Sequence, residues 1–261
     1  MYEKLYGSCI GRAIARILAA PCISRAAGAF MDSRASRLLI KPFIKTNNID
    51  LSDVEDTEFK SFNAFFTRRL KSAARPIDPA DSALISPCDA FLSVYPIDKS
   101  SVFYVKGSPY TVDTLTGGAD GFEGGQCLVF RLTPAHYHRY IFPDDGTITA
   151  YRYIKGVLHT VRPEALGKLP VFKLNSRAVS LMQCKNLGDV CFIEVGATMV
   201  GRIVNIKQAG EFKRGEEKGR FEFGGSTVIL LIKKGICVLD NIYGHSEVEV
   251  KLGQKIGDRL D

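Results

Sequence analysis

The feature that most constrains the fold is a series of short apolar runs that begins near residue 84 and continues towards the end of the chain. The runs are rich in β-branched residues or alternate apolar with polar ones, and Gly, Pro or Asp separates them. Such runs are typical of β-strands, because helices need longer stretches with a 3.6-residue period. We therefore predict a β-rich body with strands at Leu84–Ile85, Val102–Val105, Cys127–Leu132, Thr147–Tyr153, Val190–Val195, Met199–Lys207, Thr227–Lys233, Ile236–Leu239 and Glu247–Leu252.

The tripeptide Lys233-Lys234-Gly235 lies between two of these runs, Leu230–Ile232 and Ile236–Val238. A short polar segment that ends in Gly favours a tight turn, because Gly reaches positive φ without steric cost. We therefore predict a β-hairpin in which the two flanking runs pair with each other.

The first part of the chain has helical periodicity instead. Between Ser8 and Pro21 the apolar residues recur every three or four positions, which predicts an amphipathic helix. Two further segments, Ser36–Ile44 and Phe59–Leu70, are also predicted to be helical. The predicted fold class is α+β, with a helical, membrane-associating region at 1–75 followed by a β-rich domain at 76–261.

The N-terminal region is also basic. The chain has a formal net charge of +7. Residues 1–50 hold three acidic residues (Glu3, Asp32, Asp50) against eight basic ones (Lys4, Arg12, Arg16, Arg25, Arg34, Arg37, Lys41, Lys45). Each cation near anionic lipid contributes about 1 kcal/mol to binding, so we expect a membrane surface as partner; packing of the first helix on its own domain is the alternative. No stacking aromatic residues alternate with these cations, so no nucleic-acid partner is expected.

Two features bear on the cellular compartment. The chain has seven cysteines, an odd number without a CxxC pair, and no stretch resembles a secretory signal, which favours a reduced cytoplasmic compartment. The longest apolar runs fall short of the roughly 18 residues that a spanning helix needs. We therefore expect a peripheral protein at the cytoplasmic face of the cell membrane.

Three short segments carry residues suited to chemistry. In Gly224-Gly225-Ser226-Thr227, two glycines precede a hydroxyl nucleophile, a pattern that fits a strained peptide bond or simply a tight turn into a strand. His136 and His138 follow a predicted strand two residues apart, and they fit either a metal-binding pair or structural histidines. Asp89 lies in a turn and is either a functional carboxylate or a turn-stabilising residue.

Taken together, these segments resemble the phosphatidylserine decarboxylase family in order and spacing. The resemblance extends from about residue 60 to the C-terminus. It rests on the following blocks: Ser61-Phe62-Asn63-Ala64-Phe65-Phe66-Thr67-Arg68-Arg69-Leu70-Lys71, Arg75-Pro76-Ile77, Ser86-Pro87-Cys88-Asp89, Tyr137-His138-Arg139, Asn175-Ser176-Arg177, Val195-Gly196-Ala197-Thr198-Met199-Val200-Gly201, Gly224-Gly225-Ser226-Thr227 and Gly253-Gln254-Lys255-Ile256-Gly257.

The resemblance implies an enzyme that decarboxylates phosphatidylserine to phosphatidylethanolamine. It implies a proenzyme that cuts itself between Gly225 and Ser226, so that Ser226 becomes a covalent pyruvoyl group, which is a pyruvate cofactor made from the chain and acts as an electron sink. No metal is expected. Of the family's catalytic residues, Asp89 is expected to orient the imidazole of His138, and His138 to take the Ser226 proton and later return a proton to the substrate.

The resemblance also implies a β-rich body of the barrel-sandwich-hybrid kind. The segment from Ser226 to Asp261 is expected to stay bound after cleavage, because its strands belong to the same sheets as the larger chain. Whether the protein forms a homodimer, and how it contacts the lipid headgroup, stays open at the level of sequence.

Two positions depart from the family pattern. Relatives have a second His three residues after the first, where this chain has Ile141, and they usually have Gly after the motif Asp, where this chain has Ala90. Ala90 would be strained if that position needed a positive φ. The roles of His136, Arg139, Asn175 and Arg177 are open, and His136 is not expected to be catalytic.

Two other functions compete with this interpretation. A lysostaphin-like zinc peptidase would use the two histidines as a metal pair, but it needs a further His upstream, and none precedes His136. A non-enzymatic lipid-binding module would explain the basic N-terminal region. It would leave the Gly225-Ser226 block without a purpose.

Overall fold

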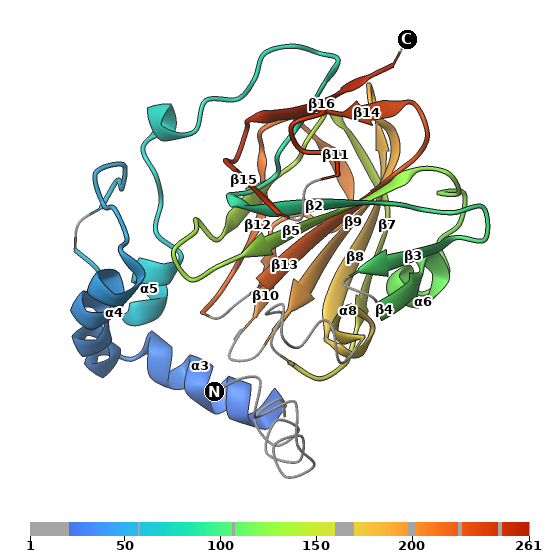
Figure 1. Ribbon diagram of the computed structural model, residues 1–261. Coiled ribbons are helices and arrows are strands. Elements are labelled where there is room, and N and C mark those ends of the chain that lie inside the picture. Colours follow the sequence, from blue (N-terminus) through green and yellow to red (C-terminus); the bar gives the residue numbers. More distant parts are fainter. Residues whose placement is uncertain are drawn as a thin grey trace.

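The computed structural model describes residues 21–56, 58–105, 108–159, 170–197, 202–223, 226–244 and 247–260. A group of helices lies on one side of a body built of β-sheets (Figure 1). The predicted α+β class with a β-rich body is therefore confirmed. The predicted Ser8–Pro21 helix falls almost wholly outside the described residues. No helix within these ranges has both the length and the apolar character needed to cross a bilayer.

The helices are short, and their bounds differ from the predicted ones. They are α3 (Pro21–Asp32), the 3₁₀ helix η1 (Arg34–Leu39), α4 (Ile40–Asn47), α5 (Phe62–Phe66), the 3₁₀ helix η2 (Ser72–Ala74), α6 (Val112–Thr116) and α8 (Val171–Leu174). The helix predicted at Ser36–Ile44 is divided between η1 and α4. The one predicted at Phe59–Leu70 is reduced to α5, which begins where the Ser61 hydroxyl accepts a hydrogen bond from the Ala64 N–H.

The strands form four antiparallel sheets in the described part of the chain, and none of these closes into a barrel. The largest has the order β11-β7-β8-β9-β13-β5-β2-β15, and the others are β1-β16-β14, β10-β12-β6 and β3-β4. The strand bounds are β1 (Ala83–Ile85), β2 (Ala90–Pro96), β3 (Val102–Val105), β4 (Ser108–Thr111), β5 (Gln126–Leu132), β6 (Arg139–Ile141), β7 (Gly146–Ile154), β8 (Arg177–Cys184), β9 (Gly188–Gly196), β10 (Ile203–Asn205), β11 (Gly210–Phe212), β12 (Glu217–Phe221), β13 (Ser226–Ile232), β14 (Ile236–Val238), β15 (Val248–Val250) and β16 (Lys255–Arg259).

Strand β13 lies in the middle of the largest sheet, and every one of its residues is buried. It pairs along its whole length with β5 on one edge and β9 on the other. The predicted hairpin is therefore wrong, because both edges of β13 are occupied and β14 pairs with β16 instead. The turn at Lys233-Lys234-Gly235 exists, with Gly235 at φ 99°, and it carries the chain from one sheet to another.

The helices have an apolar cluster of their own, built around Phe62, Phe65 and Phe66 of α5. The Phe rings meet largely edge to face; for example, the centroids of Phe43 and Phe62 are 4.9 Å apart. This geometry is the favoured one for aromatic pairs. Phe223, which belongs to the β-rich body, packs at 5.0 Å against Phe62 and joins the cluster to that body.

An ion pair between Lys218 of β12 and Glu194 of β9 is buried completely within the body. The ammonium group lies 4.8 Å from the centroid of the Phe192 ring, and it also donates a hydrogen bond to the Asn205 side chain. Burial raises the pKa of Glu194, and the charge of Lys218 partly opposes this rise. Removing either member of the pair would leave the other as a buried charge without a counter-charge.

We predict that Lys218→Met lowers the free energy of unfolding by about 3–5 kcal/mol, because it leaves Glu194 buried without a counter-charge. Urea unfolding at neutral pH measures the loss. The double variant Lys218→Met/Glu194→Met is the control, and it should recover most of the stability, since two apolar side chains replace both charges. A single variant as stable as the wild type would contradict the prediction.

Candidate active site

The sheet order brings the three sequence-predicted site residues to one end of the largest sheet. Ser226, the first residue of β13, pairs with the last residue of β5, and the loop that carries His138 follows β5 directly. Strand β2 pairs along the other edge of β5, so Asp89, which immediately precedes β2, lies at the same end. The antiparallel register, rather than proximity in sequence, gathers the three.

Ser226 is completely buried, and its Oγ has no hydrogen-bond partner. The hydroxyl of the neighbouring Thr227 is also buried without a hydrogen-bond partner among the described residues. Buried hydroxyls are normally hydrogen-bonded, and an unsatisfied one costs roughly 1–3 kcal/mol. Among the described residues, nothing thus offsets the cost of burying the Ser226 hydroxyl. Gly224 and Gly225, the other half of the predicted cleavage site, lie outside the described residues.

His138 is also completely buried, and its Nδ1 lies 2.9 Å from the carbonyl oxygen of His136. Because a carbonyl only accepts, Nδ1 carries the proton and donates it, which leaves Nε2 with a lone pair. This Nε2 has no hydrogen-bond partner. Burial lowers the pKa of His138 well below 6.5, and the positive charge of Arg68 lowers it further. The imidazole is therefore a neutral base at physiological pH.

An aromatic wall closes this part of the site. The ring of Phe66 lies 4.0 Å from the His138 ring and 5.6 Å from the ring of Phe223, centroid to centroid. Phe223 precedes Ser226 by three residues, so one side chain of α5 touches both the imidazole and the segment that leads to the serine. These contacts account for the dry surroundings of His138.

Asp89 does not bind His138 in this structure. Its two carboxylate oxygens accept hydrogen bonds from Arg75 at 2.8 and 2.6 Å, and the Leu252 N–H donates to Oδ1 at 2.9 Å. Burial alone would raise the pKa of Asp89, but the Arg75 and Leu252 bonds outweigh it and hold the pKa below 3.8. Arg75 was not among the sequence-predicted site residues; its only signal was its place in the Arg75-Pro76-Ile77 block.

His136 supports its neighbour chiefly through its backbone carbonyl. Its own Nδ1 accepts a hydrogen bond from the Thr133 N–H at 3.1 Å, and burial lowers its pKa to about 4. Both histidines lie in the loop between β5 and β6, so they do not share one face of a strand as a metal pair would. In the part of the chain that is described, no three His, Cys, Asp or Glu side chains are grouped to hold a metal ion.

The two departures from the family pattern have local explanations. Ile141 packs in a small apolar cluster with Ile85 and Leu252, the residue whose N–H binds Asp89. Ala90 begins strand β2 and is not among the residues of positive φ, so glycine is not required there. The aliphatic side chain at 141 thus supports the Asp89 pocket by packing.

Three polar residues of the motif blocks hold backbone in place. The Arg139 guanidinium donates to the Thr67 carbonyl at 3.0 and 2.8 Å, at the end of α5. Asn175 donates to the carbonyls of His159 and Gly196, each at 2.7 Å. Gly196 pairs with Ser226 across the sheet, so Asn175 helps to fix the strand beside the serine.

Arg177 is the third of these residues. Its buried guanidinium donates to four backbone carbonyls, those of Thr114, Leu115, Lys173 and Asn175. The sequence left the roles of all three residues open. Their observed partners indicate the structural role.

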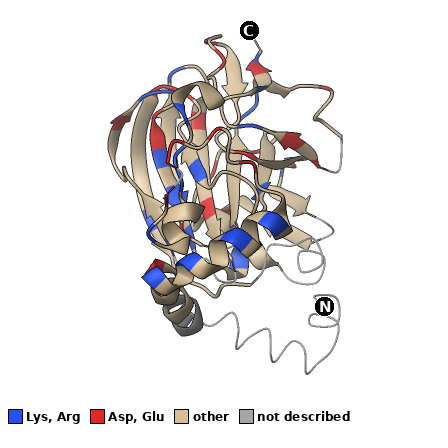
Figure 2. Cartoon of the chain, turned by 90° about the vertical axis from the view of Figure 1, so that its left-hand side faces the viewer, with Lys and Arg blue, Asp and Glu red and all other residues tan. Residues whose placement is uncertain are grey.

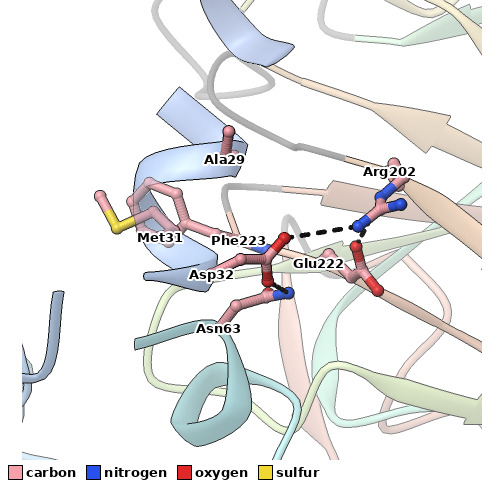
Figure 3. A pocket seen from close by; sticks show the side chains of 8 residues that line it. Ala29, Met31, Asp32, Asn63, Arg202, Glu222 and Phe223 are labelled. Atoms are coloured by element: carbon pink, nitrogen blue, oxygen red, sulfur yellow. Dashed lines mark hydrogen bonds and ion pairs between the residues drawn. The ribbon is translucent and has the colours of Figure 1, made fainter. Parts of the chain in front are cut away.

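A pocket of about 300 Å³ lies beside the segment that leads to Ser226. Figure 3 shows its polar rim: Asp32 of α3 accepts from the Asn63 amide at 2.8 Å, and Arg202 reaches both Asp32, at 3.5 Å, and Glu222, at 2.8 Å. The Asn63 side chain also accepts a hydrogen bond from the Phe223 N–H at 3.3 Å. The helical region therefore holds the Glu222-Phe223 segment through polar bonds as well as aromatic contacts.

Comparisons with known proteins identify the family of the chain. A family model described as phosphatidylserine decarboxylase matches residues 62–258. The chain is 39% identical to phosphatidylserine decarboxylase proenzyme 2 of Clostridium acetobutylicum, covering 98% of this chain and 91% of that protein. It is 41% identical to the phosphatidylserine decarboxylase proenzyme of Clostridium tetani (89% and 83% covered) and 40% identical to that of Ruminiclostridium cellulolyticum (90% and 82%).

The partners of Asp89 lead to a prediction about pH. Because the pKa of Asp89 is lower in the folded than in the unfolded chain, its ionised form stabilises the fold above about pH 3.8, and this contribution disappears as the pH falls through the folded-state value. Asp89→Asn should therefore lower the free energy of unfolding by about 1.5–3 kcal/mol at pH 7, with a smaller loss at pH 3.5. Urea unfolding at both pH values measures the difference.

Asp53→Asn is the matched control, because Asp53 is an exposed carboxylate that contacts the same Arg75 at 3.6 Å. It should change stability much less. Equal losses in the two variants, or a loss in Asp89→Asn that does not depend on pH, would contradict the role assigned to the Asp89 contacts.

Proposed function

The chain belongs to the phosphatidylserine decarboxylase family, and we propose that it decarboxylates its substrate with a pyruvoyl group made from its own Ser226. The protein is an enzyme that converts phosphatidylserine to phosphatidylethanolamine. The relatives are named proenzymes, which is consistent with self-processing. The observation that carries the proposal is the pair of buried atoms without partners, Ser226 Oγ and His138 Nε2.

The residues present fit such a group. A pyruvoyl group formed from Ser226 would stand at the start of β13, held by the ladders to β5 and β9. The orphaned Thr227 hydroxyl lies next to it in sequence and would be available as a hydrogen-bond donor. When present, the group supplies an electron-poor carbonyl that takes up the electrons released as carbon dioxide leaves.

Self-cleavage between Gly225 and Ser226 requires only atoms of the chain and one water. Ser226 Oγ attacks the Gly225 carbonyl carbon, the C–N bond breaks, and an ester with a free amine at residue 226 results. Loss of the α-proton then breaks the Cβ–Oγ bond, so that Gly225 leaves as a carboxylate and residue 226 becomes dehydroalanine. Tautomerisation and addition of water release ammonia and leave the ketone carbonyl.

His138 is the proposed base for the first step. Its Nδ1–H is held by the His136 carbonyl, so Nε2 is the nitrogen available to take the Ser226 proton. A neutral imidazole is needed for this, and the lowered pKa of His138 keeps it neutral. The same Nε2 is our candidate for returning a proton to the former α-carbon of the substrate.

Asp89 is proposed as a positioning residue. The expected hydrogen bond to His138 is replaced by bonds to Arg75 and the Leu252 N–H, and the charge of Asp89 raises the pKa of His136 against the effect of burial. We propose that Asp89 acts on His138 through this loop, by fixing the environment of the residue whose carbonyl orients the imidazole. Loss of Asp89 should then slow cleavage.

The segment from Ser226 to Asp261 is proposed to remain bound after cleavage. It contributes β13, which lies between β5 and β9, and β16, which lies between β1 and β14. Its β15 pairs with β2. Breaking one peptide bond leaves all these ladders in place, which supports a two-chain product.

The helical region 1–75 is proposed to lie at the cytoplasmic face of the membrane. Four exposed cations, Arg34, Arg37, Lys41 and Lys45, follow one another every three or four residues along η1 and α4; we call them the basic stripe. Figure 2 shows Lys and Arg gathered along a helix on this side of the molecule. Three large apolar side chains of the region are also exposed: Leu38 at 82%, Phe30 at 49% and Leu39 at 39%. Cations beside exposed apolar groups suit an anionic lipid surface.

We predict that Ser226→Ala and His138→Ala each leave a single chain of 28.7 kDa, while the wild type gives two chains that meet at 225/226. Intact mass spectrometry under denaturing conditions measures this, and it also shows whether the small chain has lost its amine. His136→Ala is the matched control, since it removes an imidazole but keeps the backbone carbonyl that accepts from His138 Nδ1. Efficient cleavage in His138→Ala would remove His138 as the base.

We also predict that Arg37→Gln/Lys41→Gln/Lys45→Gln weakens binding to anionic vesicles by about 100-fold at low salt, at about 1 kcal/mol for each cation. Co-sedimentation with vesicles of phosphatidylcholine, with and without an anionic lipid, measures the binding. The control removes three exposed cations of the β-rich body, Lys99, Lys185 and Lys234, and should have little effect. Equal losses in the two triple variants would show that only net charge matters.

A further inference from the structure

Arg68, just after α5, carries a buried positive charge. Burial lowers the pKa of its guanidinium, and the charge of Asp89, which forms no direct ion pair with it, partly opposes this fall. The residue is 5% exposed, and neither its Nε nor its Nη1 has a hydrogen-bond partner. Its Nη2 donates to the Ala135 carbonyl at 3.2 Å, and its guanidinium carbon lies 5.3 Å from the centroid of the Phe65 ring. No carboxylate of the described residues forms an ion pair with it. An unpaired buried charge is costly, so a protein that retains one is expected to use it.

Arg68 lines a cavity of about 470 Å³, which we call the Arg68 cavity. The other cations that line it, Arg75 and Lys251, are paired with carboxylates. The carboxylates that line it all have partners: Asp89 and Asp53 contact Arg75, Glu249 contacts Lys251, and Asp50 contacts Ser52. Among these charged lining residues, Asp50 has only the uncharged Ser52 as its partner, and Arg68 is the cation that no carboxylate contacts.

The Arg68 cavity adjoins the proposed active site. His136 and Tyr137 line it, and the next residue along the chain is His138. The charge of Arg68 lowers the pKa of His138, which is consistent with a short separation between the two side chains. A molecule that places its reacting carbon beside His138 and Ser226 could therefore extend an anionic group into this cavity.

We propose that Arg68 binds the phosphate group of the lipid headgroup and so positions the substrate for decarboxylation; this rests on the proposed function. The ligand chemistry is a phosphate oxyanion. A guanidinium matches it well, because it presents several N–H donors in one plane. Two of those donors, Nε and Nη1, are unused.

The carboxylate of the serine headgroup is the other anion within the substrate, and it suits Arg68 less well. That carboxylate loses its charge as carbon dioxide forms, so a strong ion pair would stabilise the substrate more than the transition state. The phosphate keeps its charge throughout the reaction. Binding it contributes affinity without opposing the chemistry.

The test compares Arg68→Met and Arg68→Lys with Arg69→Met, all in the processed full-length enzyme. Arg69 is the matched control, because it is the adjacent arginine and its side chain is exposed. Three quantities are measured: the extent of self-cleavage by intact mass, kcat and KM on phosphatidylserine in mixed micelles, and the thermal shift produced by soluble compounds. The compounds are glycerophosphoserine, inorganic phosphate and free L-serine.

We expect Arg68→Met to cleave itself and to raise KM by about 10- to 100-fold with a smaller change in kcat. Its ligand-free melting temperature should not fall, because an apolar side chain replaces an unpaired charge. The thermal shift from glycerophosphoserine should disappear while any shift from L-serine stays unchanged, and Arg68→Lys should lie between Met and the wild type. Arg69→Met should behave as the wild type.

Several results would overturn the proposal. The first is an unchanged KM in Arg68→Met. The second is an equal loss of the L-serine thermal shift in Arg68→Met, which would assign Arg68 to the carboxylate. The third is a wild-type thermal shift from inorganic phosphate as large as that from glycerophosphoserine and lost in Arg68→Met, which would indicate a site for free phosphate. A wild-type chain that stays uncleaved or releases no carbon dioxide would instead contradict the proposed function, so the two failures are distinguishable.

Discussion

The site depends on the confinement of β13 between β5 and β9. Both edges of the strand are paired over its whole length and every residue is buried, so it cannot shift register without breaking two ladders at once. Residue 226 is therefore fixed by the sheet and not by its own side chain. This fixation lets Ser226 Oγ and His138 Nε2 remain without partners, although each buried unsatisfied atom costs roughly 1–3 kcal/mol.

The short helix α5 connects the rest of the site to this strand. Its Phe66 covers His138 and its Asn63 accepts from the Phe223 N–H, and the carbonyl of Thr67, just after the helix, accepts from Arg139. A helix of five residues is not stable by itself, so these contacts determine where it lies. Arg68 lies two residues after the helix, so the same contacts also fix its position beside the Arg68 cavity.

Local pattern was enough to predict the fold class and the strands whose apolar runs are strongest, such as β3, β5 and β13. It missed β8, which begins with the buried Arg177 and contains Ser180 and Gln183, because the polar residues interrupt the run. It also assigned β14 the wrong partner, since pairing depends on which strand edges are free in the folded sheet. The motif blocks located Asp89, His138 and Ser226. They did not reveal that Asp89 binds Arg75 or that a backbone carbonyl orients His138, because such partners are chosen by three-dimensional packing.

The interleaving of strands from both sides of residue 226 has a consequence for the order of events in the life of the protein. Strand β13 is inserted between β5 and β9, which both belong to the segment before residue 226, so a separate C-terminal peptide would have to enter the largest sheet between two strands. The proposed cleavage would therefore have to follow folding, while one continuous chain still keeps the strands at high effective concentration. A cleaved molecule would lack the covalent connection that guided its assembly, so its lifetime would depend on its unfolding rate and not on an equilibrium.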